Sequence, residues 1–521
     1  MKPYTVTVAW RFFSLQGPSL STIPSTIFEQ QPWRELMPLQ WYCAAEAFFF
    51  FFLLWYKQHL QREAKHPPLQ SKEERTALAQ KVLSAIHDPQ KFLSGWFRGG
   101  KIEDRGRADL REFLGWVFWE GRVTEEDEEE LQELARKVEQ MIAPHEVKEG
   151  RGTARGLRLT LDPVEMEWRS LAWYAFIMFL DTMSHLRLLW YGFKYIYTPA
   201  TSFKIFPPRP LAAPTATARS PAKGLSYWLR PHTATTRLPV LFLHGIGVGL
   251  HPNVQYLHDL DSALNKSSAE DDKVGILVLE ILPVSCRLTR SVLARAEFLE
   301  QVTQILDHHS WERVVLVSHS YGSVLSTHIL TDSTLAARVA STLMIDPVSI
   351  LLHMPDVAYN FVVRRPRHAN EWQLWYFGSR DPGVAHTLSR HFFWSQNILW
   401  RERIVELIHG GMRLTASLAS QDLIVDTEAV GQYLMGNEVP DPVVVQDATN
   451  EKHVRLERSK KQGGREKGVN RVDDWKKRPW TGQKGLEVLW CDGLDHGDVF
   501  DEKVTRKRLV YVIVEYSKND F

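Results

Sequence analysis

The chain has 521 residues, of which 44% are hydrophobic and 24% charged, so it can bury a large core. Its 63 Lys and Arg residues nearly balance 62 Asp and Glu residues, and the resulting net charge of +1 argues against a nucleic-acid partner. The three cysteines, Cys43, Cys286 and Cys491, show no CxxC spacing, which excludes a zinc ribbon and a dense disulfide framework. Aromatic residues make up 11% of the chain, which indicates contact with a lipid phase or an apolar substrate.

An apolar run at residues 38–56 follows an N-terminal segment at residues 1–37. As a helix the run would reach about 28 Å, close to the thickness of the hydrocarbon core of a membrane. Aromatic residues bracket it as an interfacial belt would, namely Trp41, Tyr42, Trp55 and Tyr56. We therefore predict a transmembrane or membrane-associated helix, with the following chain held in the cytoplasm by basic residues. An aromatic helix docked on the protein's own core is the alternative.

Residues 57–206 are predicted to form a helical N-terminal extension. Its tryptophans and phenylalanines recur at helical spacing, which favours packing over a cofactor site. A second apolar run at residues 171–180 is too short to span a membrane, so we expect an interfacial or core helix there. Residues 207–224 are rich in Pro, Ala and Thr without an apolar period, which predicts a linker.

Residues 225–521 show short β-branched runs that alternate with amphipathic helices. This pattern predicts an α/β fold with a mainly parallel central sheet. Strands are expected to begin at Pro239, Gly275, Arg313, Ser341, Arg413 and Leu486. Helices are expected near residues 253–266, 292–309 and 322–338.

The third expected strand ends in Ser318-His319-Ser320-Tyr321-Gly322 and leads directly into a helix. A strand, a tight turn and a helix with serine at the apex form a nucleophile elbow, which makes Ser320 the candidate nucleophile. Small residues are needed two positions before and after the serine. Gly322 meets this need, and Ser318 replaces the more common first glycine.

The first expected strand ends in His244-Gly245-Ile246-Gly247, where a backbone amide would complete an oxyanion hole. We assign the hole to the amides of Ile246 and Tyr321. A dinucleotide-binding loop would need a third glycine at the position that Leu250 occupies, so the spacing excludes it.

The acid and the base are expected after later strands, because the chain order for this elbow is Ser, then Asp or Glu, then His. Asp422 follows a strand end and is the first choice for the acid. Asp346, also at a strand end, is the second choice. His496, on the loop after the last expected strand, can reach the serine and shuttle its proton.

These four motifs, HGIG, SHSYG, QDLIV and DHG, resemble those of the α/β-hydrolase superfamily. The stretches ELMPLQWYCAAEAFFFFF, FLSGWF, DPVSILLHMPDVAYNF and VAHTLSRHFFW look like a fungal, membrane-associated branch of AB hydrolase-1 type. The resemblance implies an α/β-hydrolase fold with a helical cap insertion and an N-terminal helical extension. It also implies a serine esterase or lipase-like activity.

Two segments interrupt the expected sheet. Residues 347–411 lie where such enzymes carry a cap or lid, and their many aromatic side chains would bury an apolar substrate or simply pack the cap onto the sheet. Residues 437–480 form a basic excursion, in which residues 451–480 hold 11 Lys or Arg and 5 Asp or Glu, a net charge of 11 − 5 = +6. We expect a solvated, mobile segment, with contact to an anionic membrane surface as the alternative.

The sequence therefore predicts a membrane-associated serine hydrolase that cleaves an apolar ester, thioester or amide, a lipid among them, with no metal or organic cofactor implied. Acyl transfer, cyclisation or condensation in fungal secondary-metabolite biosynthesis is a second hypothesis, because hydrolysis and transfer share one acyl-enzyme. A non-catalytic membrane-tethered scaffold is a third. The four occupied motifs disfavour the scaffold, since a degenerate hydrolase usually loses one of them.

Overall fold

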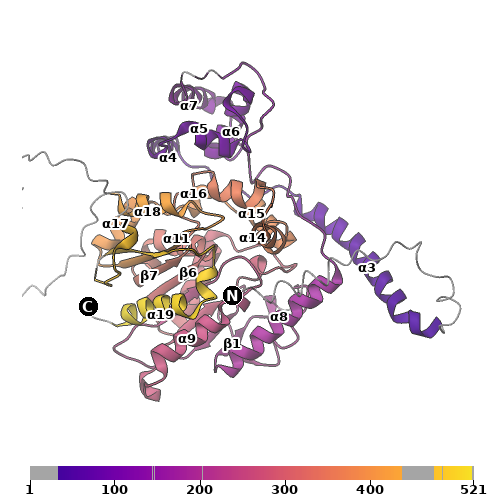
Figure 1. Ribbon diagram of the computed structural model, residues 1–521, viewed down its shortest axis with the longest axis vertical. Coiled ribbons are helices and arrows are strands. Elements are labelled where there is room, and N and C mark those ends of the chain that lie inside the picture. The colour runs from indigo at the N-terminus through magenta and orange to yellow at the C-terminus, as the bar shows by residue number, and fades with distance from the viewer. Residues whose placement is uncertain are drawn as a thin grey trace, which may run out of the picture. The chain divides into compact units, whose positions relative to one another are not determined.

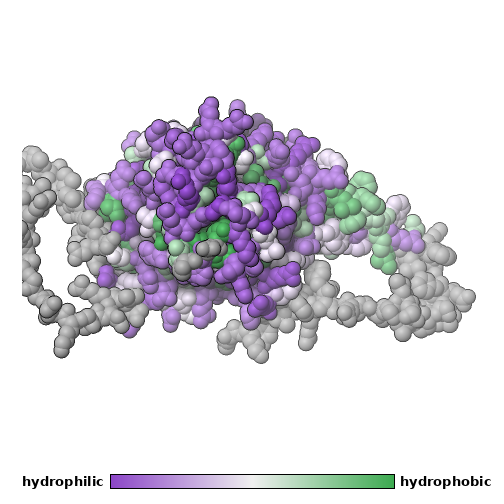
Figure 2. Space-filling view, turned by 90° about the horizontal axis from the view of Figure 1, so that it is seen from above, coloured by the Kyte–Doolittle hydropathy of each residue, from purple (hydrophilic) through white to green (hydrophobic). Residues whose placement is uncertain are grey.

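The computed structural model describes residues 33–143, 145, 147–201, 204–436, 475–483 and 485–518 (Figure 1). The chain divides into two compact units between Gln58 and His59. In the first unit the described structure is the helix α3, which covers Trp33–Leu60 and continues into the start of the second unit. Its segment Met37–Leu60 is long and apolar enough to cross a membrane, by length and composition. In Figure 2 the atoms of α3, at the right, are mostly green, the colour of hydrophobic residues.

The second unit is built on one sheet, which has nine strands within the described residues. Their order is β2-β1-β3-β5-β4-β6-β7-β8-β9. The antiparallel strand is β3, which pairs with β1 and β5, and all other neighbours run parallel. The strands are β1 (Lys194–Tyr197), β2 (Ala216–Arg219), β3 (Tyr227–Arg230), β4 (Val240–Leu243), β5 (Ile276–Leu279), β6 (Val314–His319), β7 (Val339–Ile345), β8 (Arg413–Ala419) and β9 (Leu486–Cys491).

Helices cover both faces of this sheet, so the central strands are buried on both sides and are apolar throughout. On β4, Val240 and Phe242 join the core under α9 and α19, whereas Leu241 and Leu243 join the core under α10, α11, α17 and α18. The helices are α9 (Val254–Asn265), α10 (Arg295–His308), α11 (Gly322–Thr331), α17 (Arg401–His409), α18 (Thr427–Met435) and α19 (Lys503–Ser517).

The strand order reverses at β4, which lies between β5 and β6. In open α/β sheets, ligands bind outside the carboxyl ends of the strands at such a switch point. The sheet has an antiparallel strand near one edge, and a helix follows each inner parallel strand. This arrangement, together with the strand order, confirms the predicted α/β-hydrolase fold. It also places the loops after β4, β6, β7, β8 and β9 at one end of the sheet.

The N-terminal extension contains the helices predicted from its spacing. Side chains cap helix starts in this extension: Ser71 and Glu74 form a capping box before α4, and Asp88 caps α5 ahead of Pro89. The aromatic side chains of α5 and α6 are buried and pack on one another, as the spacing predicted; they include Trp96, Phe113, Trp116 and Trp119. The helices are α4 (Lys72–Ala85), α5 (Pro89–Trp96), α6 (Arg107–Trp119), α7 (Glu128–Met141) and α8 (Leu171–Trp190).

The sheet begins earlier than residue 225, where the sequence patterns placed its start. Strand β1 lies in the expected helical extension and β2 lies in the expected linker. Both are four residues long, and β2 lies at the edge with mostly exposed residues, so neither shows a readable apolar alternation. The expected linker also supplies Arg209, whose buried guanidinium pairs with Glu280 at 2.6 Å and Asp181 at 3.1 Å.

The short helix α12 (Ser333–Ala336) precedes β7, and the remaining α-helices follow that strand. Residues 347–411 are helical, as the predicted cap requires, and contain α13 (Asp356–Ala358), α14 (Ala369–Leu374), α15 (Pro382–Arg390), α16 (Trp394–Asn397) and α17. Figure 1 shows α4 to α7 on the same side of the sheet as α15 and α16. Residues 437–474 of the predicted basic excursion lie outside the described residues.

Candidate active site

Ser320 lies at a sharp turn between β6 and α11. Its φ of +50° is in the left-handed region, which costs a non-glycine residue about 1–2 kcal/mol. The surrounding chain holds it there, since its amide donates a 3.0 Å hydrogen bond to the carbonyl of Ile345. A Cβ on Gly322 would lie 2.3 Å from the Leu243 carbonyl oxygen, and one on Gly245 would lie 2.7 Å from Ser320 Cβ. The strand, turn and helix therefore have the geometry of a nucleophile elbow.

His496 and Asp422 reach Ser320 from the loops after β9 and β8. His496 Nε2 lies 2.8 Å from Ser320 Oγ, and its Nδ1 lies 2.7 Å from Asp422 Oδ2. The other oxygen of Asp422 accepts hydrogen bonds from the amides of Ile424 and Val425, at 2.8 and 2.9 Å. These amides orient the carboxylate so that it accepts the Nδ1 proton. The imidazole then presents Nε2 as an acceptor for the serine hydroxyl.

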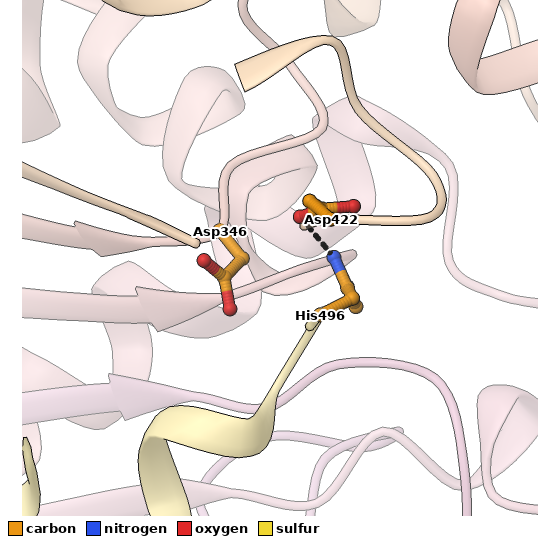
Figure 3. A group of neighbouring side chains, drawn as sticks. All are labelled: Asp346, Asp422 and His496. Carbon is orange, nitrogen blue, oxygen red and sulfur yellow. Dashed lines mark hydrogen bonds and ion pairs between the residues drawn. The ribbon is translucent and has the colours of Figure 1, made fainter. Parts of the chain in front are cut away.

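Asp346, the second-choice acid, lies beside His496 without a hydrogen bond to its ring. Its Oδ1 accepts the amide of Ala419 at 3.1 Å and its Oδ2 accepts the amide of Gly497 at 2.9 Å. Figure 3 shows the two carboxylates near His496, with the dashed bond running to Asp422 alone. The structure thus gives the two aspartates different contacts: Asp422 contacts the imidazole and Asp346 anchors the backbone of the loop that carries it.

The charges of the aspartates set the protonation of His496. Burial disfavours the imidazolium, but the charge and hydrogen bond of Asp422, together with the charges of Asp346 and Asp495, outweigh burial and raise the pKa of His496 to about 9. Burial raises the pKa of Asp346 to about 7, with His496 acting against that rise and Asp422 adding to it. The site therefore favours an imidazolium, the species that forms when histidine takes the serine proton.

The ligand atoms of Asp346, Asp422 and His496 lie within 4.8 Å of one another, which is close enough to hold a metal ion. All four carboxylate oxygens of Asp346 and Asp422 already accept a hydrogen bond, three of them from one or two backbone amides and the fourth from His496. A cation would have to displace these donors. The donor set fits a hydrogen-bonded triad better than a metal centre.

The amides of Ile246 and Tyr321 are available for an oxyanion. Within the described residues neither amide donates a hydrogen bond, and both residues line the cavity at Ser320. Tyr321 immediately precedes α11, so its amide lies at the positive end of that helix. The loop after β4 is fixed by His244, whose Nε2 accepts the Ile281 amide at 2.9 Å and whose Nδ1 donates to the Gly245 carbonyl at 2.8 Å.

A cavity opens at Ser320, which we call the serine cavity. Its cavity volume is about 40 Å³. Apart from Ser320 its lining is apolar or aromatic, and the cap contributes side chains such as Phe361, Leu388 and Trp394. This lining suits an apolar acyl group and excludes water from it.

The N-terminal extension also contributes to this lining, through Trp96 and Leu159. The sequence patterns explained Trp96 as a packing residue and gave no role to Leu159. Trp96 is a packing residue and a cavity residue at once, because its ring packs on Phe113 and Trp116 and also lines the serine cavity. No local sequence pattern predicts the contact of Trp96 with the cavity. Helical spacing identifies the buried face of a helix, but it does not identify the residues or the space that this face contacts.

Comparisons with known proteins find remote similarity to solved structures. No family model matches the sequence, and no curated protein matches it. A putative lipase from Acinetobacter baumannii is 9% identical with a TM-score of 0.37, over 66% of this chain and 97% of that one. A carboxylesterase from Bacillus subtilis is 9% identical with a TM-score of 0.32, over 65% and 98%. A monoacylglycerol lipase from Paleococcus ferrophilus is 11% identical with a TM-score of 0.34, over 56% and 99%. Function has to be inferred from the chain's own residues.

Proposed function

We propose that the protein is a serine hydrolase that cleaves an apolar ester, thioester or amide. One observation carries this proposal: the hydrogen-bonded series Ser320, His496 and Asp422 ends at an apolar cavity. A serine hydroxyl is a weak nucleophile until an adjacent base takes its proton. Here the base is in contact with the hydroxyl and is itself held by a buried carboxylate.

The proposed reaction begins when Ser320 Oγ attacks the carbonyl carbon and its proton passes to His496 Nε2. The oxyanion that forms is stabilised by the amides of Ile246 and Tyr321, and the imidazolium by Asp422. The bond to the leaving group then breaks, and His496 returns the proton to the leaving oxygen, sulfur or nitrogen. Water attacks the acyl-enzyme by the same route and releases the acid and free Ser320.

A fluorophosphonate probe tests the nucleophile. We expect the wild-type protein to be labelled and Ser320→Ala to be unlabelled. Ser318→Ala is the matched control: it removes a buried hydroxyl, two residues away, that has no hydrogen-bond partner within the described residues, and it should be labelled like the wild type. Labelling of Ser320→Ala would overturn the assignment. No labelling and no ester turnover by the wild type would favour a non-catalytic scaffold.

We also propose that the protein is held at a membrane by α3. Its exposed side chains are mostly large and apolar, among them Phe48, Phe51 and Trp55. A second apolar surface supports the proposal, because α8 exposes a stripe at helical spacing: Phe179, Met183, Leu186 and Trp190. Trp190 is 87% exposed. A lipid interface would cover such a stripe, whereas water leaves it unfavourably hydrated.

A further inference from the structure

The loop that carries Asp422 is held by side chains of the cap. Arg364 Nη2 donates a 2.7 Å hydrogen bond to the carbonyl of Leu423, and Asn360 Nδ2 donates a 3.0 Å hydrogen bond to the carbonyl of Ile424. Arg364 Nη1 also donates to Asn360 Oδ1 at 3.3 Å, so the two cap side chains support each other. The cap therefore binds the two carbonyls that directly follow the candidate acid.

These two carbonyls belong to the peptide groups whose amides orient Asp422. In the peptide group 423–424, the oxygen accepts from Arg364 and the nitrogen donates to Asp422 Oδ1 at 2.8 Å. In the peptide group 424–425, the oxygen accepts from Asn360 and the nitrogen donates to Asp422 Oδ1 at 2.9 Å. A peptide group is planar, so a contact at its oxygen fixes the direction of its N–H. Hydrogen bonds in such a series also strengthen one another.

The segment that supplies these cap side chains also lines the serine cavity. It consists of the π-helical segment η8 (Tyr359–Val363) and the next residue, Arg364. Phe361 and Val362 of η8 line the cavity, whereas Asn360 and Arg364 bind the backbone that follows the acid. π-Helical turns are rare and frequently occur at functional sites. This turn contacts both the space beside the nucleophile and the backbone that orients the acid.

A second link joins the cap to the loop of His496. Asn370 Nδ2, in α14, donates a 2.6 Å hydrogen bond to Asp495 Oδ2. The other oxygen of Asp495 accepts hydrogen bonds from the amides of Leu423 and His496, at 2.9 and 2.7 Å. Asp495 thus connects the cap, the loop of the acid and the loop of the base. The cap is therefore hydrogen-bonded to both loops that meet at Ser320.

We propose that Arg364 and Asn360 are positioning residues, which aim the Asp422 carboxylate at the imidazole through the two peptide groups that they bind. This inference rests on the proposed function, because it assigns both residues to the alignment of the triad. Both side chains act through the backbone of the acid rather than on the imidazole or the serine. The cap then has two roles, since it encloses the serine cavity and also completes the alignment of the triad.

Arg364→Met tests the proposal, because methionine keeps much of the side chain's length and cannot donate a hydrogen bond. kcat and KM for a nitrophenyl acetyl ester are measured across pH on the full-length protein in detergent, below the melting temperature of each variant. We expect kcat to fall about tenfold, since a small misplacement of an aligned group slows the chemical step. KM should change little, because the acid acts on the imidazolium that forms in the transition state.

The pH profile separates a positioning role from a loss of charge. The titratable groups that face the His496 imidazole are Asp422, Asp346, Asp495 and His319. Burial lowers the pKa of this imidazole, and among these groups Asp422 raises it most. A poorly aimed Asp422 raises it less, so the rising limb of kcat/KM should move to lower pH by about half a unit or more. Removal of the Arg364 charge alone would favour the imidazolium and move the limb to higher pH.

Arg403→Met is the matched control. The side chain of Arg403 is 25% exposed, against 26% for Arg364. Its Nε donates a 2.9 Å hydrogen bond to the carbonyl of Leu330, near the end of α11 that is remote from Ser320. This variant should keep the wild-type kcat and pH profile. Arg364→Lys keeps the charge and a donor but not the planar fork, so it should recover part of the loss in kcat.

Asn360→Leu is an independent test, because it removes the second cap contact without a change of charge. It should lower kcat and move the rising limb to lower pH, as Arg364→Met does. A wild-type kcat in either variant, or a rising limb that stays or moves to higher pH, would overturn the proposal, as would an equal fall in kcat for Arg403→Met. Failure of the proposed function looks different, because the wild-type protein would then show neither ester turnover nor fluorophosphonate labelling.

Discussion

The amide of Gly497 donates a 2.9 Å hydrogen bond to Asp346 Oδ2, so the loop that carries His496 is fastened to the end of β7. Asp346 itself has a φ of +44°, in the left-handed region, as does Ser320 at the end of the adjacent strand. Two neighbouring strands thus end in strained residues, one bearing the candidate nucleophile and the other anchoring the candidate base. Backbone strain held in this way is common where a side chain must be aimed.

Asp346→Asn is expected to shift the pH dependence of kcat/KM. His496 accepts a proton only when neutral, and because its pKa is raised to about 9, kcat/KM should rise with pH up to that region. The negative charge of Asp346 contributes to this raised pKa. Removing the charge lowers the pKa, so the rising limb should move to lower pH. A pH profile with an unmoved midpoint would contradict the proposed coupling.

Asp422→Asn is expected to lower kcat far more than Asp346→Asn does. An amide in place of the Asp422 carboxylate accepts the Nδ1 hydrogen bond less well and favours the wrong imidazole tautomer. We therefore expect kcat to fall about a thousandfold or more. Asp346→Asn keeps one side-chain oxygen that can accept a backbone amide, so its kcat should fall about tenfold or less at the pH optimum. The two kcat values decide which aspartate is the acid of the triad, and a reversed order would exchange their roles.

The juxtaposition of Ser320, His496 and Asp422 could be predicted from sequence because each follows an apolar strand of six or seven residues. Parallel strands end at the same edge of the sheet, so strand position fixes side-chain proximity. Their catalytic roles stay a prediction. Strands β1 and β2 could not be found, because neither is a continuous apolar run, whereas the equally short β4 and β5 are apolar throughout. The contribution of Trp96 to the cavity depends on how two separately predicted regions pack, which no local pattern encodes.

Ile246→Pro tests the oxyanion hole, since proline has no amide hydrogen to donate. We expect kcat to fall about a hundredfold or more, while KM changes little, because the amide acts on charge that develops in the transition state. Ile246→Val keeps the amide and should retain nearly full kcat. Melting temperatures of both variants check that the loop after β4 still folds.

Arg209→Met tests the buried ion network, which is structural. Arg209 forms a bidentate pair with Glu280 and also contacts Asp181, and its side chain is 2% exposed. Its loss leaves the buried Glu280 without a cation, whereas Asp181 keeps its ion pair with Arg287, and it should lower the free energy of unfolding by about 3–5 kcal/mol. Lys137→Met, which breaks the exposed pair with Glu133, should change it little. Urea denaturation measures both, and equal effects would show that the network contributes no more than a surface pair.

Phe51→Arg tests whether α3 spans a membrane. An arginine near the centre of a spanning helix costs about 2.5–3.5 kcal/mol on insertion scales. We expect wild-type protein to stay in the membrane pellet after carbonate extraction and the variant to be partly released. Gln58→Arg adds the same charge near the end of α3, where it can reach the interface, and should stay in the pellet. Complete release of the wild type would indicate surface docking instead.

The contribution of Trp96 and Leu159 to the serine cavity limits where the chain can be truncated. A chain that starts at residue 225 would lose β1, β2 and Arg209 together with one side of the serine cavity. Glu280 would then be buried without its cation, and the site would open to water. The second compact unit begins at His59, and a chain cut there keeps the extension, the sheet and the serine cavity whole. The helical extension is therefore part of the body that forms the serine cavity rather than an appendage to it.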